Sequence, residues 1–595
     1  MRAYIGRYSG DAEKSKQAHD LLFSAPPSIV GCDIETISIK NKSILGIGFA
    51  TLNNDNFYYT IDDPSLPWHL LHLPTITNVY HNATFDLSLE ALGKFGANID
   101  NIEDTAMLMR LLLLEVQLEA ASLLYLPEEY HTQSVLELFR QYNITSKSKS
   151  MLDLPPLVVM EKGARDAQAC LRLFEKFYPK VDKRYYRNKI KSTSLMLHMA
   201  HRGIKLDKPF VQAVHDDIAP EAAKWRATCI KLGFKPMAHM AIIEAFAANG
   251  YVVPFKWGKP STAEEDLLKI ILPDGELHPW VNYILRARKY NKMNSTYVEP
   301  LVGKDRAFTH FHLDAATGRS TSSDLNIQNV PTGERPGDIV SKAVKCPLHN
   351  QDYLFYKCAA CNNIRGMFLP DKDKLTSIDK KQIELRCFAW ISGDQKLQAV
   401  LADSTQDLHN STLEVLRRKF PKTNRVQCKN VNFGVIFSGF NSKSAATIAS
   451  GANLPGRTGV ALVIEIIKFW IKEFPVAVNW AKLQTISVSK TLRVITLKGR
   501  TLDLNKTNLP ITDKHIENCA INWPVQASAF EVFEEFMLTI IDQKIIPIED
   551  FMWQVHDEVN LDGAYENTLE PYRKDLEHLQ PFWTPYEIEE IPRWK

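Results

Sequence analysis

The sequence predicts a multidomain α/β protein. Its 595 residues leave room for about three to five domains. Residues 28–61 contain three short apolar runs rich in β-branched side chains, which is typical of strands. Residues 83–185 change to the apolar spacing of helices, and strands and helices alternate again over 364–595. We therefore expect an α/β domain that ends near residue 185 and a second α/β region behind it.

The composition describes an intracellular globular protein. Hydrophobic residues make up 45% and charged residues 24% of the chain, which are ordinary values for a protein with a large core. No apolar run approaches the roughly 18 residues that a membrane span needs, and the N-terminus lacks the order of a signal peptide. Nine scattered cysteines do not suggest a disulfide framework. A net charge of +2 does not by itself indicate nucleic acid, although a large enzyme can confine its basic side chains to one groove.

The front region carries acidic side chains that could hold metal ions. Asp33 and Glu35 end the first apolar strand, in CDIET. Because residues i and i+2 of a strand share a face, these two carboxylates project together and could bind a hard divalent cation. Asp86, Asp104 and Asp166 each stand at the start of a predicted helix. Taken singly, each of these three could instead be a helix cap.

Two acidic positions in the rear region follow apolar strands. Asp379 ends the strand in TSIDKKQIELR, and Asp557 sits in the tight turn of FMWQVHDEVNL, which reads as strand, turn, strand. An acidic turn alone would be an ordinary hairpin tip. Paired with Asp379, it completes a two-metal site of the kind used for phosphoryl transfer.

The stretch RVQCKNVNFGVIFSG carries a stripe of cations and aromatics. Arg425, Lys429, Phe433 and Phe437 recur every four residues, so on a helix they form one slowly drifting line. An ordinary amphipathic helix would put the cations and the aromatics on opposite faces. A shared face suits a triphosphate that lies along the helix, with the base stacked at the aromatic end.

Together these segments resemble the motifs of family A DNA polymerases, of the bacterial DNA polymerase I and bacteriophage type, behind a DEDD-type 3′–5′ exonuclease domain. TSIDKKQIELR resembles motif A, the stripe resembles the O helix, and FMWQVHDEVNL resembles motif C. Such an ordered set is far more specific than one short pattern. The resemblance implies a ribonuclease-H-like exonuclease domain over 1–185 and a right-hand polymerase domain over 186–595, with a thumb at about 190–310, a palm at 311–400 and 500–595, and fingers at about 401–499.

For the front domain the resemblance implies proofreading by two-metal hydrolysis, with two Mg²⁺ on Asp33, Glu35, Asp86 and Asp166. Family A proofreading domains usually have a tyrosine four residues before the last aspartate, where it orients the attacking water. This chain has Lys162 at that position. The sequence therefore predicts a complete set of metal ligands and leaves open which group orients the water and how active the exonuclease is.

For the rear domain the resemblance implies DNA synthesis from dNTPs, in DNA replication. Asp379 and Asp557 would bind two Mg²⁺, with Mn²⁺ as a possible substitute and Glu558 as an accessory carboxylate. Glu384 would block a 2′-hydroxyl and so select deoxynucleotides. The other implied nucleotide contacts are Arg425, Lys429, Phe433, Phe437, His409 and Gln382. The implied DNA contacts are Arg319, Asn326, Gln328, Asn522, Gln526 and His556, and Lys292 lies in a basic run that could grip phosphates.

An insertion at 346–361 is unusual for this family. Cys346 and His349 form a C-x2-H pair, and Cys358 and Cys361 form a C-x2-C pair. Two such pairs can supply a closed tetrahedral zinc site. The alternative is a loop with incidental cysteines. We expect a structural Zn²⁺ here and no catalytic one, because four protein ligands leave no open position.

Primer–template DNA and dNTPs are the implied partners, and a helicase, a primase or a processivity factor are candidates for further ones. We expect a monomer in the cytoplasm, that of a bacterial host if a bacteriophage encodes it, with no membrane partner. Residues of this sequence oppose three other functions. A single-subunit RNA polymerase is opposed by Glu384 and the exonuclease motifs. A non-catalytic DNA-binding remnant is opposed by Asp379 and Asp557, and a nuclease whose rear domain only grips DNA is opposed by the triphosphate stripe.

Overall fold

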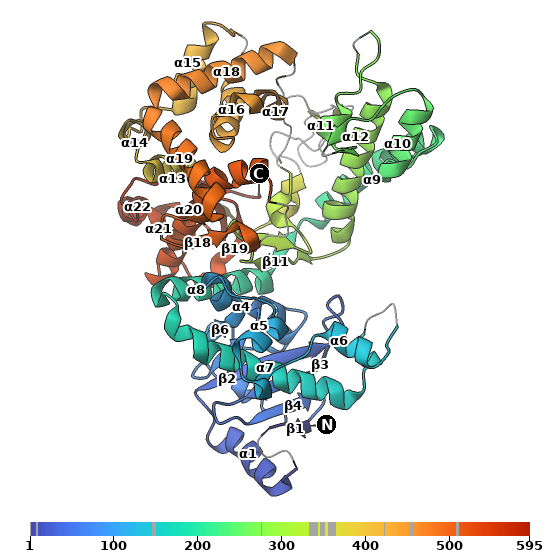
Figure 1. The fold of residues 1–595 in the computed structure, drawn as a ribbon, viewed down its shortest axis with the longest axis vertical. Coiled ribbons are helices and arrows are strands. Elements are labelled where there is room, and N and C mark those ends of the chain that lie inside the picture. Colours follow the sequence, from blue (N-terminus) through green and yellow to red (C-terminus); the bar gives the residue numbers. More distant parts are fainter. Residues whose placement is uncertain are drawn as a thin grey trace.

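The computed structural model places a front α/β domain beneath a larger rear region that carries two helical arms (Figure 1). Within the described residues, no helix is both long and apolar enough to cross a bilayer. The four predicted zinc ligands, Cys346, His349, Cys358 and Cys361, lie outside these residues. The structure describes residues 2–6, 10–145, 150–256, 258–274, 276–331, 343–345, 352–354, 364–421, 423–452, 454, 456–506 and 511–594.

A six-stranded mixed sheet forms the front domain. The three predicted strands are confirmed as β2 (Ile29–Thr36), β3 (Ile44–Ala50) and β4 (Asn56–Thr60). The sheet order is β1-β4-β3-β2-β5-β6, with β1 at Arg2–Tyr4, β5 at Thr77–Tyr80 and β6 at Ile102–Asp104. Strands β2, β5 and β6 run parallel, whereas β3 and β4 pair antiparallel. Strands β5 and β6 lie farther along the chain, between helices. The strands of this domain thus do not all precede the helices, which differs from the order that the sequence pattern predicts.

Helix α7 (Pro156–Phe177) packs directly on β2 and β3. Two glycines of the sheet allow this close approach. A β-carbon at Gly31 would lie 2.3 Å from the Ala167 carbonyl oxygen, and one at Gly48 would lie 2.1 Å from the Gly163 carbonyl oxygen. The helix backbone thus rests on the strand that ends in Asp33 and Glu35.

Two helix predictions for the front domain need correction. Asp166 lies in the middle of α7, because the helix begins ten residues earlier at Pro156, and proline is well suited to a first helical position. Asp86 is the last residue of a short helix, α3 (Ala83–Asp86), and only a 3-10 turn at Leu92–Phe95 follows. Gly93 packs against His201 and Gly96 takes a φ of 73°, which ends the helical path. By contrast, Asp104 caps α4 (Thr105–Leu111) as expected of an acid that enters a helix.

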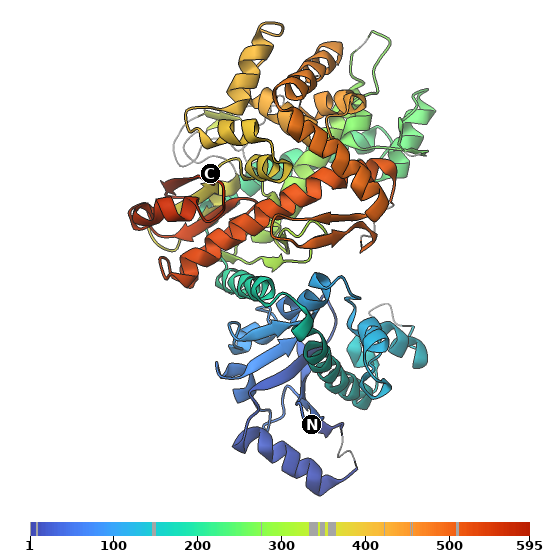
Figure 2. The ribbon, with the colours of Figure 1, turned by 60° about the vertical axis from the view of Figure 1, so that its left-hand side comes forward.

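Helix α8 (Lys183–Arg202) crosses the expected domain boundary and joins the two regions (Figure 1). It packs against α20 (Asp513–Asp542), the long orange-red helix of Figure 2. The Lys189 ammonium lies 2.7 Å from the Glu534 carboxylate, and these side chains are only 2% and 5% exposed. Lys191 and Asp542 form an exposed pair between the same two helices, also at 2.7 Å.

The rear region is built on a four-stranded antiparallel sheet in the order β19-β20-β16-β21. Strand β16 (Leu375–Lys380) lies between β20 (Glu558–Asp562) and β21 (Tyr586–Ile591). Strand β19 (Phe551–Val555) turns directly into β20, which confirms the predicted strand–turn–strand. Helix α20 contacts α13 (Ile383–Ser392) and α19 (Pro475–Thr491), and so connects the sheet to the helices above it.

Two helical arms stand on opposite sides of this sheet (Figure 1). One contains α9 (Lys208–Lys231), α10 (His239–Ala248) and α12 (Pro279–Lys292), with an apolar core of its own. The other contains α15 (Leu408–Arg417), α16 (Arg425–Phe437), α17 (Ala445–Gly451) and α18 (Gly456–Glu473), around a separate core. Asn424 and Gln427 form a capping box at the start of α16, so the predicted stripe lies on a well-defined helix.

The buried pair between α8 and α20 yields a stability prediction. Lys189→Met leaves the Glu534 carboxylate buried without a cation, which should lower the free energy of unfolding by roughly 3–5 kcal/mol. Lys191→Met, which breaks the exposed pair between the same helices, should cost at most about 1 kcal/mol. Urea denaturation followed by tryptophan fluorescence compares the two variants. Equal losses of unfolding free energy in the two variants would contradict the importance of the buried pair. The double variant Lys189→Met/Glu534→Leu, which removes both buried charges, should recover most of the stability.

Candidate active sites

Two carboxylates from neighbouring strands meet at one end of the rear sheet. Asp379 is the second-to-last residue of β16, and Asp557 lies in the turn between β19 and β20. His556 takes a left-handed φ of 56° in this turn. The Lys380 amide donates a hydrogen bond to the Asp557 carbonyl at 3.0 Å, which fixes the turn against β16. The sheet thus holds both acids on a rigid support.

A cavity of about 440 Å³ opens at this end of the sheet. It brings together residues that are far apart in the sequence, from β16, α13, α16, α20 and the β19–β20 turn. Phe530, Phe533 and Gln554 also line it, and sequence reasoning missed them. The predicted site residues among its lining are Asp379, Asp557, Gln382, Glu384, Lys429, Phe433, Phe437, Arg319 and His556.

Burial makes the two acids hard to ionise. The pKa of Asp379 is raised to about 8, first by burial and then by the charges of Asp557 and Glu558, while Lys429 opposes the shift. Burial also raises the pKa of Asp557. Carboxylates that repel each other in a low-dielectric cavity are typical of a functional site. Their oxygens are the hard ligands that Mg²⁺ prefers, so the donor set fits this ion.

The stripe on α16 points mostly into the same cavity. Lys429, Phe433 and Phe437 line it, and the rings of Phe433 and Phe437 stack with centroids 6.0 Å apart. Arg425, at the start of the helix, instead forms an ion pair with Asp407. Of the two cations of the stripe, only Lys429 is among the lining residues of the cavity, and the aromatic pair continues the same wall.

A buried network of hydrogen-bonded side chains lies behind Phe433. The His409 ring lies 5.7 Å from the Phe433 ring and is only 1% exposed. Trp470 Nε1 donates to Asn432 Oδ1 at 2.8 Å, and Asn432 Nδ2 lies 3.2 Å from His409 Nδ1. Because an indole nitrogen can only donate, the Asn432 amide is oriented with its NH₂ group toward the histidine.

This orientation assigns the His409 tautomer. Nδ1 accepts a hydrogen bond, so the proton of the neutral ring resides on Nε2. Burial lowers the pKa of His409 to about 4, so the neutral ring dominates at pH 7. Nε2 is shielded from solvent and has no hydrogen-bond partner among the described residues. It is a donor available for an acceptor that enters beside Phe433.

Two cavity residues neutralise each other. The Arg319 guanidinium forms an ion pair with the Glu384 carboxylate. Gln328, predicted to contact DNA, is buried next to them, where its Nε2 donates to Gln554 Oε1 and Ser320 Oγ at 2.9 Å. Gln554 in turn donates to the His556 carbonyl. Gln328 therefore supports the acidic turn from behind.

Several other predicted residues do not line the cavity as far as the structure describes it. Glu558 is not among the lining residues, and its Oε1 accepts hydrogen bonds from Asn560 Nδ2 at 2.6 Å and Trp594 Nε1 at 2.9 Å, while its charge still acts on Asp379. Tertiary contacts that the motif does not encode draw it there. The residues that lie apart from the cavity lining are Glu558, Arg425, His409, Asn326, Gln328, Asn522, Gln526 and Lys292.

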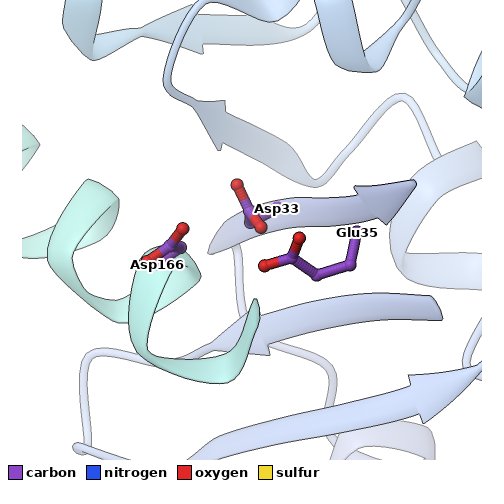
Figure 3. A group of neighbouring side chains, drawn as sticks. All are labelled: Asp33, Glu35 and Asp166. Carbon is purple, nitrogen blue, oxygen red and sulfur yellow. The ribbon is translucent and has the colours of Figure 1, made fainter. Parts of the chain in front are cut away.

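The front domain holds a second acidic cluster. Asp33 and Glu35 project from β2 toward Asp166 on α7 (Figure 3), and their carboxylate oxygens lie within 4.8 Å of one another. The prediction that these three acids meet is confirmed. Asp86 does not belong to the group, because its Oδ1 accepts a hydrogen bond from the Ile34 amide at 3.3 Å on the backbone of β2.

Lys162 reaches into this cluster. It precedes Asp166 by one turn of α7, forms an ion pair with Asp166, and its Nζ lies 3.5 Å from Glu35 Oε1. Burial raises the pKa of Glu35 to about 7, although the ammonium of Lys162 opposes this shift. Burial and the charge of Asp166 raise the pKa of Asp33 well above its ordinary value. The three carboxylates fit a divalent cation, and the ammonium of Lys162 already lies among them.

Comparisons with known proteins agree with this geometry. The thermostable DNA polymerase I of Thermus aquaticus is 27% identical over 421 residues, which cover 67% of this chain and 46% of that protein. DNA polymerase I of Helicobacter pylori is 25% identical over 394 residues, or 63% of this chain and 39% of that protein. The chain thus spans less than half the length of these curated relatives.

The fold also matches a solved structure, the polymerase domain of Pol1 from M. smegmatis in complex with DNA primer–template and dNTP. The TM-score is 0.69 at 17% sequence identity, and the match covers 98% of each chain. The sequence model of DNA polymerase family A matches residues 246–579, which contain the whole cavity described above. Since this match covers more than half of the chain, the protein belongs to DNA polymerase family A.

Proposed function

We propose that this protein is a template-directed, DNA-dependent DNA polymerase that adds deoxynucleotides to a primer end. One observation carries the proposal: a single cavity joins Asp379 and Asp557 to Lys429 and the aromatic pair of α16. Acids that bind metal ions, a cation for a triphosphate and a stacking surface for a base are what nucleotidyl transfer requires. Membership of the family and the fold it shares with a polymerase bound to DNA and dNTP support this function.

In this proposal Asp379 and Asp557 hold two Mg²⁺, which supply the Lewis acidity that activates a 3′-hydroxyl and stabilises a leaving pyrophosphate. Lys429 binds the triphosphate, and the base stacks against Phe433. The Nε2–H group of His409 donates a hydrogen bond to a phosphate oxygen. Arg425 exchanges its ion pair with Asp407 for the phosphates as α16 moves toward the sheet.

The pair Arg319–Glu384 is proposed to open on DNA binding. Arg319 then reaches the end of the primer–template, and Glu384 remains beside the sugar, where it excludes a 2′-hydroxyl. The arm of α9 to α12, with Lys292 at its edge, acts as the thumb and binds backbone phosphates without reading sequence. The arm of α15 to α18 acts as the fingers, and the rear sheet with α20 acts as the palm. Incorporation of ribonucleotides at deoxynucleotide rates would favour an RNA polymerase instead.

The front domain, residues 1–185, is proposed to be a 3′–5′ exonuclease that removes mispaired primer ends. The cluster of Asp33, Glu35 and Asp166 on a mixed sheet supports this role. Asp86 would join these ligands through its second carboxylate oxygen, because its Oδ1 accepts a hydrogen bond from the Ile34 amide. The structural zinc, the accessory partners, the monomeric state and the cytoplasmic location remain predictions.

Removal of one palm acid should abolish synthesis. Asp557→Asn keeps the size of the side chain but removes a charge worth several kcal/mol in the transition state, which corresponds to a rate loss of about a thousandfold or more. Primer extension with Mg²⁺ and four dNTPs measures this rate. Asp33→Asn, the matched change in the front cluster, should extend primers as the wild type does. Wild-type extension by Asp557→Asn would contradict the assignment.

Metal binding in the palm should release a proton at neutral pH. Because the pKa of Asp379 is about 8, the carboxyl is protonated at pH 7 and must lose its proton to bind a cation. Metal affinity should therefore rise with pH through about 8, and proton release should vanish well above it. The same raised pKa means that, without metal, ionisation of Asp379 lowers the stability of the fold as pH rises toward 8.

Titration calorimetry with Mn²⁺ in two buffers of different ionisation enthalpy measures the protons released. The difference between wild type and Asp379→Asn isolates the palm from the front cluster. Proton release that is the same in both proteins would show that Asp379 binds no metal or is already ionised.

Asn432 should affect the triphosphate through His409. Asn432→Leu keeps a similar volume but frees the His409 tautomer, so a hydrogen bond to a charged phosphate worth about 1.5–3 kcal/mol becomes less available. We expect KM for dNTPs to rise by about tenfold with little change in kcat. Nitrogen NMR of labelled histidine should show mixed tautomers only in this variant. In a His409→Ala background the same substitution should change KM no further, and an additive effect would contradict the link.

A further inference from the structure

Lys162 places a cation of the protein where its proposed function calls for metal ions. We propose that the Lys162 ammonium substitutes for one of the two divalent cations of the front cluster, so that this cluster binds a single divalent ion. The inference rests on the proposal that the front domain is a metal-dependent exonuclease. It concerns how many ions the cluster can hold, and it does not depend on how fast that site cuts DNA.

Both carboxylate oxygens of Asp166 already have partners within the protein. Its Oδ1 accepts a hydrogen bond from the Thr132 hydroxyl, and its Oδ2 is paired with the Lys162 ammonium. Residues four apart on a helix lie on the same face, so Lys162 reaches Asp166 without distortion of α7. A metal ion that used Asp166 as fully as in a two-metal site would have to displace one of these partners.

The packing around Lys162 keeps its charge inside the cluster. Its side chain is 8% exposed. The neighbouring Gly163 lies so close to the sheet that a β-carbon there would meet Tyr58 Cε2 at 2.6 Å and Glu35 Cγ at 3.1 Å. Helix and strand therefore enclose Lys162 and Glu35 in one space, where an unpaired charge of either sign would be strongly unfavourable.

The charges of the cluster balance with one divalent ion. Asp33, Glu35 and Asp166 carry three negative charges when ionised, and Lys162 supplies one positive charge. For these three acids the remaining two negative charges match a single divalent cation, and Asp86, whose Oδ1 is bound to the Ile34 amide, stands outside the group. Glu35 Oε1 is buried, lies 3.5 Å from the Lys162 ammonium and accepts no hydrogen bond of ordinary geometry among the described residues, so it can still take part in binding one ion.

The test counts bound ions. In a background of Asp379→Asn and Asp557→Asn, which removes the palm acids, Mn²⁺ binding is followed by electron paramagnetic resonance. Ions lost on addition of Asp33→Asn are assigned to the front cluster. We expect one front ion in this background protein and two after Lys162→Met. Arg165→Met removes an exposed cation from the same helix, which is paired with Glu161 at the surface, and should leave the count at one.

Thermal melting provides a second readout that does not depend on catalysis. Without Mn²⁺, Lys162→Met should melt at a lower temperature than the background protein, because the carboxylates repel one another. Mn²⁺ should raise its melting temperature more than that of the background protein. If Lys162→Met does not fold, Lys162→Tyr replaces it, and the count in the background protein remains decisive.

The outcomes separate this inference from the proposed exonuclease. Two front ions in the background protein, or no gain on Lys162→Met, would overturn the inference. If the background protein binds two front ions and the wild type degrades primers, the inference fails but the exonuclease proposal is retained. Absence of any front ion in both proteins would overturn the inference and the exonuclease proposal together.

Discussion

The rear active site depends on the enclosure of two carboxyl groups at the end of a rigid sheet. Asp379 and Asp557 are held by β16 and by the turn after β19, and burial raises the pKa of both. Asp379 therefore keeps its proton at pH 7, and the cost of ionising both acids in one enclosed site is met only when a cation binds between them. The surrounding elements serve this constraint, since α13, α16 and α20 close the cavity and the Gln328–Gln554 pair supports the turn.

Two arginines of the rear site are bound by carboxylates of the protein itself, and one histidine keeps a donor that no described residue uses. Arg425 is paired with Asp407, Arg319 is paired with Glu384, and the proton of His409 has no partner among the described residues. In our proposal each of these ion pairs is exchanged for a phosphate or a nucleic-acid contact. In the front cluster Lys162 likewise pairs with acids of the protein. This pair is buried, because helix and strand enclose Lys162 together with its acids.

Local patterns predicted much of this architecture. The four-residue spacing of the α16 stripe, the acidic turn before β20 and the paired acids of β2 are all encoded within short segments, and the structure confirms them. Contacts between distant segments were not predictable. Glu558 turns to Trp594, Asp86 to the Ile34 amide and Lys162 into the acids, because each responds to neighbours that only the tertiary fold supplies. The start of α7 was also misplaced, since an acid at position 166 reads equally well as a cap.

The central claim is that the cavity at Asp379 and Asp557 is where a nucleotide joins a primer. The most direct measurement is a crystal structure of the complex with a chain-terminated primer–template, a matched dNTP and Mn²⁺, with the ions located by anomalous scattering. The account predicts Mn²⁺ bound by Asp379 and Asp557, the triphosphate on Lys429, and Arg425 released from Asp407. A nucleotide bound elsewhere, or metal ions that contact neither acid, would contradict it.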